Sequence, residues 1–207
     1  LYDPSFQPWR SREWREKLHD GDPRSLVSLE RKYVLVTLLS QALGRAAGDV
    51  AECGVYKGGT ARIIAERLEG TGRRLELFDT FAGMPETNPK EDLHRAGDFG
   101  DTTLESVRAY LAGFSDVDFY AGLIPSSLHA VAGRTFCFVH VDLDLYDAIA
   151  AATAFFYPRV TAGGVFVYDD YGAGDCPGAR KAVDEFFAGR PEVPLVLGTG
   201  QCIVVKV

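Results

Sequence analysis

Short apolar runs that alternate with segments of helical periodicity constrain the fold of this chain most strongly. The runs have the length of β-strands, and the segments between them repeat their apolar residues every three or four positions. We predict strands over 50–55, 75–79, 117–120, 136–142, 164–169, 195–198 and 202–207, and helices near 11–18, 25–47, 60–68, 104–113, 126–131, 148–157 and 178–188. Such alternation predicts an α/β fold in which crossover helices join parallel strands.

The last two predicted strands depart from this pattern. Only Thr199, Gly200 and Gln201 separate them, which is too short a connection for a crossover helix. They must therefore pair as an antiparallel hairpin. The sequence predicts one reversed strand in an otherwise parallel sheet.

The chain is organised as one domain with an amino-terminal extension, since 207 residues fit a single hydrophobic core. We assign residues 1–24, with Trp9, Trp14 and three prolines, to an arm, and residues 25–207 to one domain. Residues 81–100, rich in Pro, Gly, Asn and Asp, match neither periodicity. A connection of that length in a compact domain is usually functional or mobile, so we predict that it is a lid.

The composition argues against several classes of protein. The formal net charge is −7, and no run of Lys and Arg is long enough for a nucleic-acid partner. No apolar stretch approaches the ~18–20 residues of a membrane helix, and none resembles a secretory signal, so we expect no membrane partner and take a cytoplasmic location as the default. The four cysteines (Cys53, Cys137, Cys176 and Cys202) form no C-x-x-C pair, and we expect buried free thiols rather than disulfides or zinc ligands.

The turn after the first strand indicates a cofactor pocket. Residues 52–60 (Glu-Cys-Gly-Val-Tyr-Lys-Gly-Gly-Thr) lead into a helix, where glycines let a ligand approach the backbone and free N–H groups can bind its polar end. Asp79 ends the second strand twenty positions after Gly59, the spacing at which an acid binds ribose hydroxyls in doubly wound sheets. These features favour a ribose-bearing cofactor. The alternative is a structural turn, with a capping or turn role for Asp79.

Four acidic residues follow two strands that we expect to be neighbours. Asp142 and Asp144 end the fourth strand, and Asp169 and Asp170 end the fifth. The carboxyl ends of parallel strands meet where ligands bind in open α/β sheets, so four carboxylates would crowd one place. Like charges there repel unless they are protonated or bridged by a cation, and Mg²⁺ prefers such oxygen ligands. Helix N-capping, the alternative, explains one acid per helix but not four.

Other side chains near these motifs have structural interpretations. His140 is on the same face of its strand as Asp142 and could orient a ligand, but a hydrogen-bonded core histidine is at least as good an assignment. We therefore leave His140 out of the catalytic set. Tyr146, Tyr168 and Tyr171 could line a substrate pocket, although aromatic packing is the safer assignment.

Taken together, the motifs resemble the macrocin O-methyltransferase family, bacterial enzymes that methylate sugars and phenols of antibiotics and other secondary metabolites. The resemblance covers roughly residues 25–207 and is most specific at 52–59, 78–85 (Phe-Asp-Thr-Phe-Ala-Gly-Met-Pro), 141–147 (Val-Asp-Leu-Asp-Leu-Tyr-Asp) and 163–172 (Gly-Gly-Val-Phe-Val-Tyr-Asp-Asp-Tyr-Gly). It implies a Rossmann-like class I methyltransferase fold, with a seven-stranded, mostly parallel sheet, one antiparallel strand and helices on both faces. Residues 121–128 and Leu143 depart from the family's usual pattern.

The resemblance also implies cofactors and residue roles. S-adenosylmethionine would place its methionine part on the first block, its ribose on Asp79 and its adenine near Gly122. Asp142, Asp169 and Asp170 would hold Mg²⁺, and Asp144 would be the general base. The expected cofactor-binding residues are Glu52, Gly54, Tyr56, Lys57, Gly58, Thr60, Asp79, Phe81, Gly122 and Asp142.

We therefore expect an S-adenosylmethionine- and Mg²⁺-dependent O-methyltransferase that acts on a sugar or phenolic hydroxyl of a small molecule, including glycosylated natural products. The family also favours a homo-oligomer. Three alternatives stay open: a methyltransferase for a glycolipid or capsule sugar or for a nitrogen acceptor, a receiver domain with acids around Mg²⁺, and a non-catalytic cofactor-binding partner. The receiver domain fits poorly because it has no use for the glycine-rich turn.

Overall fold

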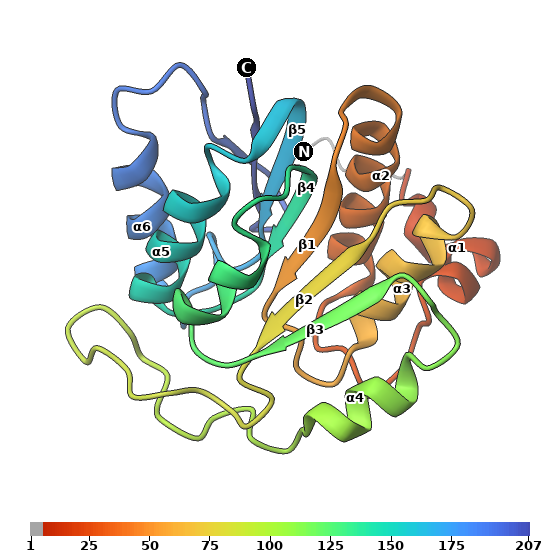
Figure 1. The fold of residues 1–207 in the computed structure, drawn as a ribbon, viewed down its shortest axis with the longest axis horizontal. Helices are drawn as coiled ribbons and strands as arrows, with labels where there is room; N and C mark the ends of the chain where they lie inside the picture. The colour runs from red at the N-terminus through yellow and green to blue at the C-terminus, as the bar shows by residue number, and fades with distance from the viewer. Residues whose placement is uncertain (1–5) are drawn as a thin grey trace.

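A seven-stranded sheet forms the centre of the computed structural model, which describes residues 6–207 (Figure 1). Residues 1–5 of the predicted arm lie outside the described residues. The strands are β1 (Asp49–Cys53), β2 (Leu75–Asp79), β3 (Val117–Ala121), β4 (Phe136–Val141), β5 (Val160–Tyr168), β6 (Leu195–Val196) and β7 (Cys202–Val205). The helices are η1 (Pro8–Arg10), α1 (Arg12–Lys17), α2 (Leu29–Arg45), α3 (Gly59–Leu68), α4 (Leu104–Tyr110), η2 (Ser126–Val131), α5 (Tyr146–Phe156) and α6 (Pro177–Phe187), where η denotes 3₁₀.

The strand order is β3-β2-β1-β4-β5-β7-β6. All pairs from β3 through β5 are parallel, whereas β7 is antiparallel to both β5 and β6. The predicted hairpin and the single reversed strand are thus confirmed. The chain winds outward from β1 to β3 and then returns to β4 on the other side of β1, and ligands bind at such a reversal of strand order.

Helices cover both faces of the sheet. Figure 1 shows α5 and α6 on one side and α2 and α3 on the other. In β5, Phe166 and Tyr168 pack into the core under α5 and α6, while Val165 and Val167 pack into the core under α2 and α3. A strand that is buried on both faces appears in the sequence as a continuous apolar run, and β5 could therefore be predicted from the sequence.

The described part of the arm docks on the domain. Leu18 is fully buried against Val36 of α2 and Ile63 of α3, and the Trp14 ring meets Tyr33 edge-on at 4.7 Å. Further along, the Gly59 N–H donates to the carbonyl of Arg24 at 3.3 Å. The arm therefore reaches the glycine-rich turn.

Three predicted elements differ most from the structure. Strand β5 begins at Val160 rather than at 164. Helix α2 begins at Leu29 rather than at 25, because Ser28 is extended (φ −68°, ψ 161°), and the preceding residues run along a cavity wall instead. Residues 126–131 form a 3₁₀ helix rather than an α-helix. Among the helices of residues 6–207, none combines the length and the apolar character that crossing a bilayer requires.

Candidate active site

A cavity of about 410 Å³ lies at the carboxyl ends of the parallel strands, a volume typical of small-molecule sites. Its wall contains residues of the glycine-rich turn (52–60), the ends of β2 and β4, the segment after β3, residues 81–100, the loop before α6 and residues 24–27. The predicted site residues in this wall are Gly54, Tyr56, Thr60, Asp79, Gly122, Asp142, Asp144 and Asp170. The cavity therefore joins the predicted cofactor turn to the predicted metal site.

Asp79 organises the glycine-rich turn. Its carboxylate accepts backbone N–H bonds from Val55 at 2.6 Å, Tyr56 at 2.9 Å and Phe81 at 2.7 Å. These contacts give Asp79 the turn role that the sequence left as an alternative. Asp79 also lines the cavity, and its contact with a ribose stays a prediction.

Gly54 brings the turn against the end of β4. Its φ is +87°, and a Cβ atom built on it would lie 1.6 Å from the carbonyl oxygen of Asp142. The Asp142 N–H in turn donates to the carbonyl of Cys53 at 2.8 Å. Only glycine fits this close approach, so the turn and the acidic strand end form one rigid unit.

Three carboxyl groups in the wall, those of Asp142, Asp144 and Asp170, have raised pKa values, because burial and their mutual proximity disfavour the charged form. Burial and the neighbouring charge of Asp169 raise the pKa of Asp142 to about 8. Burial, with the charges of Asp142 and Asp144, raises the pKa of Asp170 well above its usual range, and burial also raises the pKa of Asp144. The Asp144 N–H donates to Asp170 Oδ2 at 3.0 Å, which fixes these two residues relative to each other. Acids in this state fit a bound cation.

Asp169 lies behind the wall in a different environment. Its carboxylate accepts hydrogen bonds from Arg31 and, at 2.7 Å, from Gln201 Nε2. Although burial alone would raise it, the pKa of Asp169 is lowered by His140, Arg31 and Gln201. Among residues 6–207, Asp142 and Asp169 share one potential metal-donor group with His140, and Asp144 and Asp170 share another with Cys176. The predicted set of Asp142, Asp169 and Asp170 spans both groups and stays a prediction.

His140 is a fully buried, hydrogen-bonded histidine, as its structural interpretation requires. Its Nδ1 lies 3.0 Å from Glu52 Oε1, and Glu52 is also fully buried. Within the described chain, His140 Nε2 and Glu52 Oε2 have no hydrogen-bond partner. His140 Nε2 faces Asp169 Oδ1 at 3.6 Å, so the imidazole lies next to the most buried carboxylate of the acidic cluster.

Four predicted cofactor-binding residues lie outside the wall. Glu52 bonds to His140, as described, and Lys57 forms an ion pair with Asp101. Gly58 is the N-cap of α3 with φ +86°, and Phe81 is buried beside Phe119. Each has a structural role in the immediate surroundings of the cavity, and their contact with a cofactor stays a prediction.

The segment predicted as a lid, residues 81–100, contains no helix or strand and runs past the carboxyl ends of the strands (Figure 1). It contributes Gly83, Met84, Pro85, His94 and Phe99 to the wall. Its middle is tied to α5, because the Tyr146 N–H donates to Asp92 Oδ1 at 2.9 Å, and to α6, because Lys181 Nζ lies 2.6 Å from Glu91 Oε1. The segment thus closes one side of the cavity.

Unusual backbone conformations gather at this place. Five non-glycine residues of the described chain have positive φ, and three of them, Tyr56, Phe99 and Asp144, line the cavity. Phe81, a fourth, lies beside it. Strained backbone of this kind accumulates at functional sites, where the surrounding structure holds it in place.

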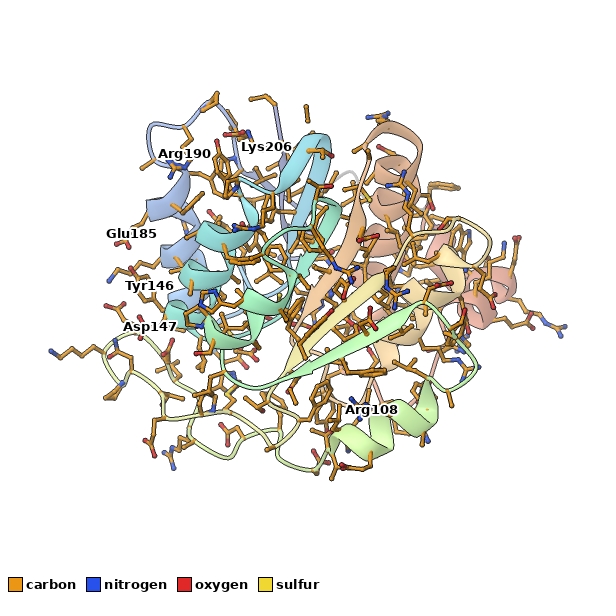
Figure 2. The ribbon with its side chains drawn as sticks, in the orientation of Figure 1. Arg108, Tyr146, Asp147, Glu185, Arg190 and Lys206 are labelled. Carbon is orange, nitrogen blue, oxygen red and sulfur yellow. The ribbon has the colours of Figure 1, made fainter. Side chains whose placement is uncertain are left out.

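The three tyrosines that were candidates for a substrate pocket do not line the cavity. Figure 2 shows Tyr146 on the outer side of α5 next to Glu185, to which its hydroxyl donates at 2.6 Å. Tyr168 is buried in the core, and the Tyr171 hydroxyl donates to Asp184 at 2.7 Å. The packing interpretation is confirmed for all three.

The wall residues that were not predicted from the sequence as site residues include Arg31, His94 and Cys176. Arg31 lies in the amphipathic helix α2, His94 in the irregular 81–100 segment, and Cys176 just before α6. Neither periodicity nor spacing distinguishes them, because only the three-dimensional fold brings them to the cavity.

Comparisons with known proteins support a methyltransferase. A family model described as Macrocin-O-methyltransferase (TylF) matches residues 32–192. The 8-demethyl-8-(2,3-dimethoxy-alpha-L-rhamnosyl)-tetracenomycin-C 4'-O-methyltransferase of Streptomyces olivaceus is 28% identical over 193 residues, which cover 84% of this chain and 70% of that protein. The demethyldecarbamoylnovobiocin O-methyltransferase of Streptomyces niveus is 26% identical over 192 residues, which cover 86% of this chain and 71% of that protein.

Solved structures show the same fold. The O-methyltransferase NovP superposes with a TM-score of 0.81 at 23% identity, covering 94% of this chain and 88% of that one. The calicheamicin methyltransferase CalS11 gives a TM-score of 0.73 at 18% identity, covering 99% of each chain. The Rossmann-like class I methyltransferase fold is thereby confirmed.

Proposed function

This chain belongs to the macrocin O-methyltransferase family and is an O-methyltransferase, and from this premise we propose that it methylates a sugar or phenolic hydroxyl of a natural product. The methyl donor is S-adenosylmethionine, and the reaction depends on Mg²⁺. One observation carries the proposal: a single cavity contains both the glycine-rich turn and the carboxylates of Asp142, Asp144 and Asp170. A homo-oligomer and a cytoplasmic location stay predictions.

Different residues of the chain would bind the methyl donor and the metal ion. When bound, S-adenosylmethionine supplies an activated methyl group, and Mg²⁺ supplies the positive charge that lowers the pKa of an acceptor hydroxyl. The turn ordered by Asp79 holds the donor, and Gly122 lies on the opposite side of β2 in the same wall. Asp142, Asp169 and Asp170 offer the carboxylate oxygens that a hard divalent ion prefers.

Asp144 is the best-placed proton acceptor. It lines the cavity, its backbone is fixed by the bond to Asp170, and burial raises the pKa of its carboxyl so that it binds a proton more readily than an exposed acid does. Alignment of donor and acceptor accounts for much of the remaining rate enhancement, because a bound pair reacts as a single molecule.

The acceptor carries two adjacent oxygens, since a vicinal diol or a catechol chelates a metal best. The relatives support a sugar in particular. The Streptomyces olivaceus relative is named for the 4' position of a rhamnosyl group, and a Micromonospora griseorubida relative that is 28% identical over 156 residues is named mycinamicin III 3''-O-methyltransferase.

Methyl transfer to a panel of rhamnosides, other deoxysugar glycosides and catechols, followed by mass spectrometry, tests the proposal. We expect transfer that stops after chelation of the metal and returns with Mg²⁺. Asp144→Asn should lower kcat by roughly 10²-fold and leave the affinity for S-adenosylmethionine unchanged, because it removes only a proton acceptor. Tyr146→Phe, outside the cavity, is the matched control and should keep full activity.

Two results would contradict separate parts of the proposal. If methyl transfer were undiminished after chelation of the metal, the reaction would not depend on Mg²⁺. If the folded wild-type protein did not bind S-adenosylmethionine in calorimetry, S-adenosylmethionine would not be its methyl donor.

A further inference from the structure

Four potential metal-binding side chains converge at the side of the cavity that the 81–100 segment closes. His94 comes from that segment, Asp144 from the loop after β4, and Asp175 and Cys176 from the loop before α6. All four line the cavity. Three segments of the chain therefore deliver an imidazole, a thiol and two carboxylates to one place.

Five of the six pairs among these residues have donor atoms 3.3–4.0 Å apart, close to the separations in one coordination sphere. Cys176 Sγ lies 3.3 Å from Asp144 Oδ1, 3.6 Å from His94 Nε2 and 3.7 Å from Asp175 Oδ1. His94 Nε2 lies 3.8 Å from Asp144 Oδ1 and 4.0 Å from Asp175 Oδ2. Ligand atoms at 2.0–2.3 Å from a tetrahedral ion are about 3.3–3.8 Å apart, so small rotations of His94 and Asp175 complete the geometry.

The imidazole is already oriented for a metal. His94 Nδ1 lies 3.4 Å from Asp98 Oδ2, which leaves Nε2 directed at Cys176 and Asp144. Histidine ligands in metal sites commonly present one ring nitrogen to the ion while a carboxylate holds the other. Asp98 thus has the position of a supporting residue.

We propose that His94, Asp144, Asp175 and Cys176 form a binding site for a thiophilic divalent cation such as Zn²⁺, separate from the predicted magnesium site. A thiolate and an imidazole select Zn²⁺ or Co²⁺, whereas Mg²⁺ takes oxygen ligands. On binding, Cys176 releases its thiol proton to solvent and Sγ donates a lone pair to the ion, as do His94 Nε2 and one oxygen of each carboxylate. The oxidation state of the metal does not change.

Only one of the four cysteines has this environment. Cys53, Cys137 and Cys202 are fully buried in β1, β4 and β7, and none belongs to a metal-donor group in the part of the chain that the structure describes. Cys176 belongs to two such groups, one with His94 and Asp175 and one with Asp144 and Asp170. All four thiols are buried and none forms a disulfide, as the sequence predicts. The proposal departs from that expectation only in giving Cys176 a role as a metal ligand.

Occupation of the site has two consequences. It ties the 81–100 segment to the loops after β4 and before α6, which restricts opening on that side. It also coordinates Asp144, so that Zn²⁺ competes with the use of this carboxylate as a proton acceptor. The cation binds whether or not methyl transfer occurs, so the test below is independent of the proposed activity.

Absorption spectroscopy with Co²⁺ on the metal-free, full-length chain tests the site. We expect one equivalent of Co²⁺ to give a thiolate-to-cobalt charge-transfer band in the near ultraviolet, with the intense visible bands of tetrahedral Co²⁺, and one equivalent of Zn²⁺ to remove both. Cys176→Ser should abolish the charge-transfer band. His94→Ala should weaken Co²⁺ binding by at least tenfold.

Matched variants and contrary results complete the test. Cys202→Ala removes a thiol elsewhere, His129→Ala removes an exposed imidazole outside the cavity, and both should keep the wild-type spectrum. Circular dichroism verifies that each variant is folded. No charge-transfer band in the wild type, or an unchanged band in folded Cys176→Ser, would overturn the site. If His94→Ala bound Co²⁺ as tightly as the wild type does, the ion would be bound by Asp144, Asp170 and Cys176 instead, and the proposed ligand set would be wrong.

Discussion

Arg31 provides the positive charge nearest to Asp169, whose side chain is fully buried. The guanidinium reaches from α2 across 138 positions of sequence to the carboxylate. A buried carboxylate that loses its cationic partner is left uncompensated, which typically costs 3–5 kcal/mol. This contact distinguishes Asp169 from Asp142, Asp144 and Asp170, which line the cavity.

Replacement of Arg31 tests this role. We expect Arg31→Met to lower the free energy of unfolding by about 3 kcal/mol, because the Asp169 carboxylate loses its guanidinium partner and keeps only His140 and Gln201. Addition of Asp169→Asn should restore a large part of the loss, since the uncompensated charge is then absent. Urea denaturation of the two single variants and the double variant measures the coupling. Strictly additive effects would show that the two side chains do not depend on each other.

The contribution of Tyr171 to the stability of the fold depends on pH. Burial and the hydrogen bond to Asp184 raise the pKa of Tyr171 to about 12. Because the unfolded chain ionises this phenol near its ordinary pKa of about 10, the stabilisation is fully present below pH ~10 and is lost as the pH rises toward 12.

Tyr171→Phe should therefore be less stable than the wild type at pH 9, by about 1 kcal/mol for one lost hydrogen bond, and the difference should shrink at pH 11. Urea midpoints at the two pH values measure it. A difference that grows between pH 9 and pH 11 would mean that the pKa is not raised in the folded protein.

Among the structural elements, the tight junction of the glycine-rich turn with β4 is the least tolerant of change. We expect Gly54→Ala to destabilise the fold by more than ~3 kcal/mol, because its Cβ would collide with the Asp142 carbonyl and its φ is positive. Gly44→Ala in α2, where nothing lies within 4 Å of a built Cβ, is the control and should be neutral or stabilising by up to ~1 kcal/mol. Thermal unfolding compares them, and equal melting temperatures would contradict the close approach.

The elements also explain how much of the site the sequence could predict. Asp79, Asp142, Asp144 and Asp170 follow predicted strands, and parallel pairing brings strand ends to one edge, so the pattern located them. His94 has no such marker, because it lies in a segment without helix or strand. Likewise, the sequence groups the four acids at one place, and only the packing of α2 on the sheet reveals that Arg31 pairs with Asp169.

At the scale of the whole molecule, the fold was predictable because each local pattern agreed with it. The sequence contains strands that are buried on both faces, helices that connect them and a hairpin with a three-residue loop. Few strand topologies are compatible with all of these. Periodicity alone does not give the strand order, β3-β2-β1-β4-β5-β7-β6, which only the folded chain reveals. Membership of that family excludes the receiver-domain alternative.

The cavity wall has two parts of different origin. One contains the strand ends held by backbone pairing, with Asp79, Asp142 and Gly54. The other contains loops, among them residues 24–27 and the 81–100 segment. Loops accept substitutions and insertions more readily than the elements that they connect. Exchange of these two loop segments for those of a relative is therefore expected to change the acceptor that is methylated, while the strand ends stay as they are.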